Sequence, residues 1–154
     1  MSRSLSDPSG GPDAAPVTDY FGLAVPFMQF LGLIPEHLEL DYCRTRLPAL
    51  PHLTNSRGEL HGGTLMSVLD FTLTAAARSH APTRYGVATI EMSSHFLDSA
   101  HGDVIIEATC LRRGRTIAFC DGTVTDGVSG KRLVVARASL KLLERRPAPE
   151  VMSR

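Results

Sequence analysis

The stretch that decides the fold runs from residue 61 to residue 77 and reads His61-Gly62-Gly63-Thr64-Leu65-Met66-Ser67-Val68-Leu69-Asp70-Phe71-Thr72-Leu73-Thr74-Ala75-Ala76-Ala77. From the second glycine onward, its apolar residues fall on every side of a helix, which is the pattern of a helix buried all round. Asp70 is the only ionisable residue between His61 and Arg78. A carboxylate removed from water must be paired, neutralised or kept for chemistry, so Asp70 is the first candidate functional residue.

Gly62 and Gly63 give this helix an open first turn. The first turn leaves backbone N–H groups unpaired and carries the positive end of the helix dipole, and glycine lets a ligand approach closely. This end therefore suits an anion, or a carbonyl oxygen that becomes negative during acyl transfer. Gly62 and Asp70 are eight positions apart, which is about 12 Å along a helix. Both can touch one carbonyl only if two helices pack antiparallel across a two-fold axis, which predicts a site shared by two subunits.

Length and composition restrict the class of protein. The chain has 154 residues, enough for one domain with a real core, and its 16 Lys and Arg balance 16 Asp and Glu. This balance gives no reason to expect nucleic acid or an anionic membrane as a partner. No apolar run is long enough to span a bilayer and no secretory leader is evident, which predicts a cytoplasmic protein. The three cysteines and six histidines lack disulfide or metal-ligand spacing, so we expect free thiols, no metal and no redox cofactor.

The composition along the chain predicts one domain between two tails: an N-terminal tail over 1–17, a domain over 18–144 and a C-terminal tail over 145–154. The elements expected before and including the central helix are a short helix over 20–32, a half-buried strand over 36–44, a loop over 47–58 and the helix itself. Four strand-like runs follow, over 85–97, 103–112, 116–125 and 131–143. This order predicts an α+β fold whose sheet curls around the helix, with a second copy of the chain closing the open side.

Residues 55–63 and Asp70 together carry a resemblance to a known family. They read Asn55-Ser56-Arg57-Gly58-Glu59-Leu60-His61-Gly62-Gly63, with the acidic residue on the following helix. This N-x-x-G-x-x-H-G-G pattern with a later acid and a β-meander resembles the hotdog-fold acyl-CoA thioesterases, in the branch with phenylacetyl-CoA-type and mitochondrial acyl-CoA thioesterases. The resemblance covers about residues 27–143. It implies a hotdog fold, in which a curved antiparallel sheet wraps a long central helix.

The resemblance also implies a role for each motif residue. The Gly62 N–H would polarise the thioester carbonyl, with Gly63 beside it against the substrate, and Asp70 from the partner subunit would act as nucleophile or general base. Asn55 would hold the carbonyl or the attacking water. His61 would orient the loop or assist the departing thiolate. On the residues alone, Asp70 as a core acid and the two glycines as mere shapers of the helix entry stay open as alternatives.

Two further features follow from the resemblance. Thr89 matches the Ser or Thr that positions the attacking water in family members, but simple alternation turns it away from Ile90, Met92 and Phe96. A strand bulge or a different core face is therefore needed for Thr89 to reach the site. The predicted binding site for the nucleotide of coenzyme A is the basic hairpin that contains Arg112, Arg113 and Arg115.

The predicted function is hydrolysis of an acyl-CoA to the free acid and coenzyme A by a homodimer, with a homotetramer built from two such dimers as the alternative assembly. The thiolate of coenzyme A departs readily, so one carboxylate and a helix N-terminus suffice, and the sequence has no G-x-S-x-G elbow or Cys/His pair. Two alternatives stay open: a non-hydrolytic hotdog protein that binds acyl-CoA or an acyl carrier protein, and a structural subunit with an empty pocket. The acyl group is not set by the sequence.

Overall fold

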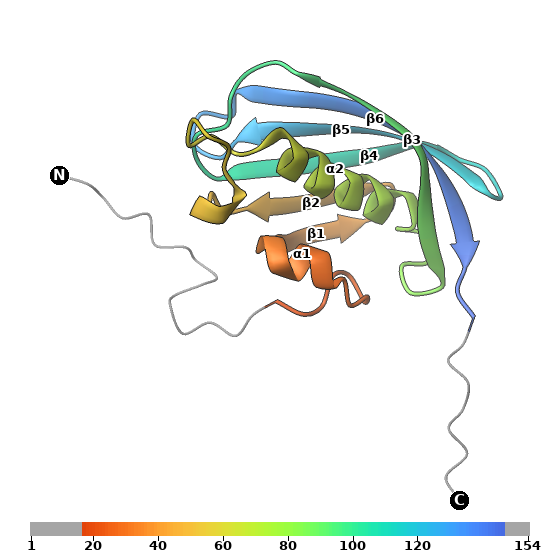
Figure 1. Ribbon diagram of the computed structural model, residues 1–154. Coiled ribbons are helices and arrows are strands. Elements are labelled where there is room, and N and C mark those ends of the chain that lie inside the picture. The colour runs from red at the N-terminus through yellow and green to blue at the C-terminus, as the bar shows by residue number, and fades with distance from the viewer. Residues whose placement is uncertain (1–16, 147–154) are drawn as a thin grey trace, which may run out of the picture.

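The computed structural model describes residues 17–146, which form one antiparallel sheet, a long helix and a short helix (Figure 1). The elements are α1 (Pro26–Leu31), β1 (Ile34–Glu39), β2 (Tyr42–Leu47), the 3-10 helix η1 (Pro51–Leu53), α2 (Gly62–Ala77), β3 (Tyr85–Phe96), β4 (Val104–Arg113), β5 (Ile117–Asp126) and β6 (Arg132–Glu144). The strand order across the sheet is β1-β2-β4-β5-β6-β3. Nearly all of each predicted tail, 1–16 and 147–154, lies outside the described residues. Within the described part, no helix is both long and apolar enough to cross a membrane.

Helix α2 lies across one face of the sheet and contacts all six strands, which confirms the α+β architecture expected from the sequence (Figure 1). The side chains of Val68, Leu69 and Leu73 are fully buried between helix and sheet. Gly122 on β5 allows this close approach, since a Cβ there would lie 3.1 Å from side-chain atoms of Leu69 and Leu73. The hydrophobic core therefore lies between α2 and the inner face of the sheet.

One side of α2 is not covered within a single chain. Gly63 and Met66 are exposed, and Ser67, Asp70 and Thr74 are half-buried. These residues recur every three or four positions, so they form one stripe along the helix. The single chain therefore leaves one side of the helix open, as expected from the sequence, and this stripe carries the only charged residue of the helix.

The segment over 36–44, expected as one strand, is a hairpin of β1 and β2 that turns at Leu40 and Asp41. Asp41 has φ of +64°, and its N–H donates to Ser79 Oγ at 2.8 Å. Its carboxylate pairs with Arg113 at 2.7 Å. Because both partners are distant in sequence, the local alternation of apolar residues does not reveal the turn. The sheet consequently has six strands, one more than expected.

The first helix is shorter than the expected 20–32 because the chain before Pro26 makes a turn. Phe21 in this turn has φ of +56°. The side chain of Arg78, which is 2% exposed, holds the turn by donating to the carbonyl oxygens of Tyr20 at 2.9 Å and Phe21 at 3.0 Å. A helix prediction made from Tyr20 onward cannot include this distant donor.

Strand β3 pairs only with β6 and is one edge of the sheet. Thr89 lies opposite Leu140, but the next paired residue, Glu91, lies opposite Ser139. Ile90 is therefore the extra residue of a β-bulge. The strand that follows α2 in sequence thus lies beside the last strand of the β4-β5-β6 meander, at the edge of the sheet.

The bulge changes which residues of β3 face the helix. Before the bulge, Thr89 lies on the same face as its buried partner on β6, and after the bulge Met92 and Phe96 do so. The expectation that Ile90 shares a face with Met92 and Phe96 is wrong, and Ile90 is 57% exposed. Thr89, Met92 and Phe96 consequently lie on the helix side of the same strand.

Candidate active site

Asp70 and Thr89 form the first half of the candidate site. The hydroxyl of Thr89 on β3 donates to the carboxylate of Asp70 on α2, with 2.5 Å between Oγ1 and Oδ1. Within residues 17–146, no lysine, arginine or histidine forms an ion pair with Asp70. The carboxylate is held by a neutral donor and keeps Oδ2 available. The bulge that the sequence required for this contact is present one residue after Thr89.

The N-terminus of α2 forms the second half. His61 is the N-cap, and its Nδ1 accepts a hydrogen bond from the Gly63 N–H at 2.8 Å. The backbone N–H of His61 donates to Leu53 O at 2.9 Å. Among the described residues, the Gly62 N–H has no acceptor. His61 thus holds the loop and caps the helix, whereas the Gly62 N–H is available to a ligand.

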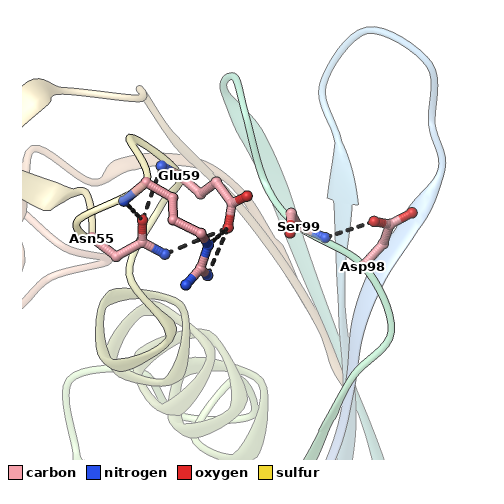
Figure 2. A network of polar contacts seen from close by, with 5 residues as sticks. Asn55, Glu59, Asp98 and Ser99 are labelled. Atoms are coloured by element: carbon pink, nitrogen blue, oxygen red, sulfur yellow. Dashed lines mark hydrogen bonds and ion pairs between the residues drawn. The ribbon is translucent and has the colours of Figure 1, made fainter.

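Asn55 shapes the loop that leads to this helix end (Figure 2). Its Oδ1 accepts hydrogen bonds from the backbone N–H groups of Arg57 at 2.8 Å and Glu59 at 3.2 Å. The guanidinium of Arg57 pairs with the Glu59 carboxylate at 2.9 Å, and this hydrogen bonding lowers the pKa of Glu59. Figure 2 shows this loop across from Asp98 and Ser99, which follow β3. With its oxygen occupied by two backbone donors, Asn55 acts on the loop in this structure, and its contact with substrate stays a prediction.

A cleft of about 480 Å³ opens beside Gly62. Its walls come from the loop before α2 and from the segment that follows β3, and its apolar lining includes Leu60, Leu65, Phe96 and Ala100. The Phe96 ring lies 3.5 Å from where a Cβ on Gly62 would be. The wall over 97–100 contains no motif that marks it in the sequence, and its direct continuation from Phe96 is the signal that could have identified it.

One chain therefore holds two separate half-sites on one helix and one strand. Asp70 lies with Thr89, and Gly62 lies with Phe96. The two positions on α2 are about 12 Å apart along the helix axis, so a single carbonyl group cannot contact both in one chain. The structure places both positions on one continuous helix, which is the premise of the spacing argument made from the sequence.

The three arginines of the basic hairpin have different surroundings. The guanidinium of Arg113 donates to Ala77 O at 2.8 Å, at the C-terminal end of α2, and pairs with Asp41. Its side chain is only 14% exposed. Arg113 therefore holds the helix end, while Arg112 and Arg115 are exposed and their contact with a nucleotide stays a prediction.

The thiols and other potential metal ligands lie elsewhere. Within residues 17–146, no three His, Cys, Asp or Glu side chains are grouped so that they could hold a metal ion. Cys43, Cys110 and Cys120 are free and buried, as expected from their spacing. Burial raises the pKa of the Cys43 thiol to about 12. None of the three is part of either half-site.

Known proteins are similar to this chain in sequence. A family profile described as Thioesterase superfamily matches residues 57–132. A Halobacterium salinarum protein that carries an esterase name is 32% identical over 102 residues, which cover 63% of this chain and 68% of that protein.

Solved structures give the same result. A thioesterase family protein from Silicibacter pomeroyi is 27% identical with a TM-score of 0.74, and the match covers 79% of this chain and 91% of that one. A Streptococcus mutans protein solved with bound acetyl-CoA is 20% identical with a TM-score of 0.66, covering 75% of this chain and 91% of that one. These likenesses confirm the hotdog fold expected from the sequence.

Proposed function

Because this chain belongs to the thioesterase superfamily, we propose that it hydrolyses an acyl-CoA to the free acid and coenzyme A at a site shared by two subunits. The observation that carries the proposal is the placement of two half-sites along β3. Asp70 and Thr89 supply a carboxylate, and Gly62 beside Phe96 supplies an unpaired N–H. Thioester hydrolysis needs both groups at one carbonyl, the first to attack or to activate water and the second to hold the oxyanion.

The edge strand β3 supports the pairing of two chains. It is 12 residues long and presents exposed apolar side chains, with Ile90 57% and Phe96 48% exposed, and Leu97 directly after it is 55% exposed. A long apolar edge strand has unpaired backbone groups that favour pairing with another strand. A second copy of β3, running antiparallel, would extend the sheet and cover these side chains.

The geometry of that pairing would complete the site. In an antiparallel pair with its two-fold axis near Ser93, Thr89 of one chain lies opposite the partner's Phe96. Asp70 accompanies Thr89, and the partner's Gly62 accompanies the partner's Phe96, so the two groups meet on the helix side of the sheet. Two equivalent sites result per dimer. Whether dimers pair further into a tetramer stays a prediction.

At such a site the chemistry divides between the subunits. The thioester oxygen accepts a hydrogen bond from the Gly62 N–H of one subunit, which stabilises the oxyanion of the tetrahedral intermediate. Asp70 of the other subunit takes a proton from the attacking water, or attacks the carbonyl itself to form an acyl anhydride that water then hydrolyses. The hydrogen bond from Thr89 to Oδ1 orients the carboxylate with Oδ2 toward the substrate. Collapse of the intermediate breaks the C–S bond and releases the thiolate.

Two further observations support coenzyme A as the thiol. The Streptococcus mutans protein of this fold was solved with acetyl-CoA bound, which shows that this architecture can hold an acyl-CoA. In this chain, the exposed cations Arg112 and Arg115 lie on the hairpin next to the C-terminal end of α2, where they could meet phosphates. Neither Arg112 nor Arg115 forms an ion pair with an acidic side chain of the described residues.

The test uses a matched pair of substitutions at Gly62. Gly62→Pro removes the N–H but suits the position, because proline is favoured at the first helical residue and His61 before it is extended (φ −64°, ψ 137°). Gly62→Ala adds the same Cβ, 3.5 Å from Phe96, and keeps the N–H. In thiol release from a panel of acyl-CoAs, we expect Gly62→Pro to lower kcat by about 10²–10³-fold and Gly62→Ala to change it only a few-fold.

Subunit mixing tests whether the site is shared. We expect Asp70→Asn to lower kcat by about 10²–10⁴-fold without changing the oligomeric state. When the Asp70→Asn and Gly62→Pro chains are dissociated and reassembled together, mixed dimers contain one intact site, and about a quarter of wild-type activity should return. Mixing that restores nothing would contradict a shared site. Acyl-CoA binding without turnover by the wild-type protein would instead favour the non-hydrolytic acyl-binding function.

A further inference from the structure

Two cysteines outside the candidate active site lie directly opposite each other in the sheet. Cys110 on β4 is the Cα partner of Cys120 on β5. Both are free thiols, with Cys110 5% and Cys120 0% exposed. Because paired residues of neighbouring strands place their side chains on the same face, the two thiols point to the same side of the sheet.

The backbone shows which kind of cross-strand pair this is. The Cys110 N–H donates to Asp41 O at 2.8 Å, on the β2 side of β4. A residue in an antiparallel strand directs its N–H and C=O to the same neighbour, so Cys110 forms a non-hydrogen-bonded pair with Cys120. The Cα atoms of such a pair are about 4.5 Å apart, within the roughly 4.4–6.8 Å that a disulfide spans. The strands therefore need little movement to allow a bond between the two sulfurs.

The surroundings also favour reaction at Cys110. The register of β4 and β5 shifts between Cys110 and Arg112, which leaves a local irregularity in the ladder at this end of the hairpin. Hydrogen bonding with the Cys120 thiol lowers the pKa of Cys110 to about 7 and raises the pKa of Cys120. Cys43, whose pKa is raised by burial, lies on another strand and is the natural internal control.

We propose that Cys110 and Cys120 form a dithiol site that a small-molecule disulfide converts to an intramolecular disulfide bond. The Cys110 thiolate attacks one sulfur of glutathione disulfide, whose S–S bond breaks and releases one glutathione thiolate. Cys120 loses its proton and attacks the Cys110 sulfur of the mixed disulfide, which releases the second glutathione. The two cysteines are oxidised by two electrons and one glutathione disulfide is reduced to two thiols. This site is independent of the proposed thioester hydrolysis.

The experiment treats the reduced full-length protein with glutathione disulfide and follows intact mass and peptide maps. We expect a loss of about 2 Da, a Cys110–Cys120 linked peptide, and full reversal by dithiothreitol. Cys43→Ser should behave like the wild type, whereas Cys110→Ser and Cys120→Ser should not lose this mass. Because the bond closes a loop in the unfolded chain, the oxidised wild-type protein should also have a higher Tm than the reduced one.

A second probe tests the proximity of the thiols without oxidation. Phenylarsine oxide binds two adjacent thiols through one arsenic atom and releases water, so we expect one arsenic per chain in the wild type and in Cys43→Ser. Either single variant of the pair should lose this binding while circular dichroism shows the native fold. The proposal is overturned if the folded wild type yields a persistent glutathione adduct, a bond to Cys43, or no bridging by either reagent.

Discussion

The two ends of helix α2 differ in whether side chains of the protein bind their free backbone groups. At the C-terminal end, Arg113 donates to the carbonyl of Ala77 and also pairs with Asp41, so the negative end of the helix dipole meets a cation. At the N-terminal end, the first turn contains no acidic residue, and the Gly62 N–H has no acceptor among the described residues. The N-terminal end opens into the cleft beside Phe96.

This difference shows where a ligand would be stabilised. Every helix leaves unpaired donors at one end and unpaired acceptors at the other, and proteins normally satisfy both with side chains or water. In this protein, Arg113 donates to a carbonyl oxygen at the C-terminal end of α2. At the N-terminal end, the Gly62 N–H has no acceptor among the described residues. We therefore expect substitutions at the closed end to change stability, and substitutions at Gly62 to change activity.

The largest effect on stability is expected at Arg78, the C-cap residue of α2. Arg78→Ala removes donors from the carbonyl oxygens of Tyr20, Phe21 and Pro82 in a buried region, and should cost about 3 kcal/mol or more. Urea unfolding measures the loss. Arg84→Ala is the control, because Arg84 pairs with an exposed glutamate and its loss should change the free energy of unfolding far less than the loss of Arg78. Equal losses in the two variants would contradict a special role for Arg78.

Arg113→Ala should have the next largest effect, about 2 kcal/mol, because it removes a donor from the carbonyl oxygen of Ala77 and breaks the ion pair with Asp41. The neighbouring exposed residue provides the comparison, and Arg112→Ala should change the free energy of unfolding by less than about 0.5 kcal/mol. If Arg113 served the substrate instead, its loss would raise KM and leave stability unchanged. Chemical unfolding and steady-state kinetics on both variants separate these outcomes.

His61→Ala should cost about 1 kcal/mol, because the N-cap hydrogen bond to the Gly63 N–H is lost. His61→Asn should retain most of the stability, since asparagine is among the best N-cap residues. The same pair of variants addresses activity. Near wild-type turnover by His61→Asn would support the loop-holding role, whereas loss of turnover with stability preserved would indicate a direct role toward the leaving thiolate.

The smallest effect is expected from Gly63→Ala. Alanine should favour the helix by about 0.5–1 kcal/mol, but its Cβ would lie 3.1 Å from Nδ1 of His61 and weaken the cap. We expect these terms to cancel within about 0.5 kcal/mol. In the His61→Ala background, the same substitution should be stabilising. Thermal unfolding of the four proteins in this double-mutant cycle reports the coupling directly.

The sequence predicted the features that depend on local pattern. The long apolar run gave helix α2, and the spacing of Gly62 and Asp70 gave two separated half-sites. The turn at Asp41 was missed because its support comes from Ser79 and from Arg113. For the same reason, the role of Arg113 at the helix end could not be read from its place beside a hairpin glycine. Contacts between distant segments decide such features, and a pattern of neighbouring residues does not contain them.

Because of the bulge at Ile90, the site depends on whether the number of residues from Thr89 to Phe96 is odd or even. Thr89 and Phe96 are seven residues apart, an odd number, so in a regular strand they would face opposite sides of the sheet. Because the bulged Ile90 takes no paired position on β6, Thr89 and Phe96 are separated by an even number of paired positions and both face the helix. As long as the bulge is kept, β3 can therefore gain or lose residues between these two positions only in pairs if both half-sites are to stay on one face. A single deletion that kept the bulge would leave every site residue in the chain and still turn Thr89, the partner of the Asp70 carboxylate, away from the face that Phe96 occupies. Deletion of Ile90 itself would remove the bulge and keep both residues on one face.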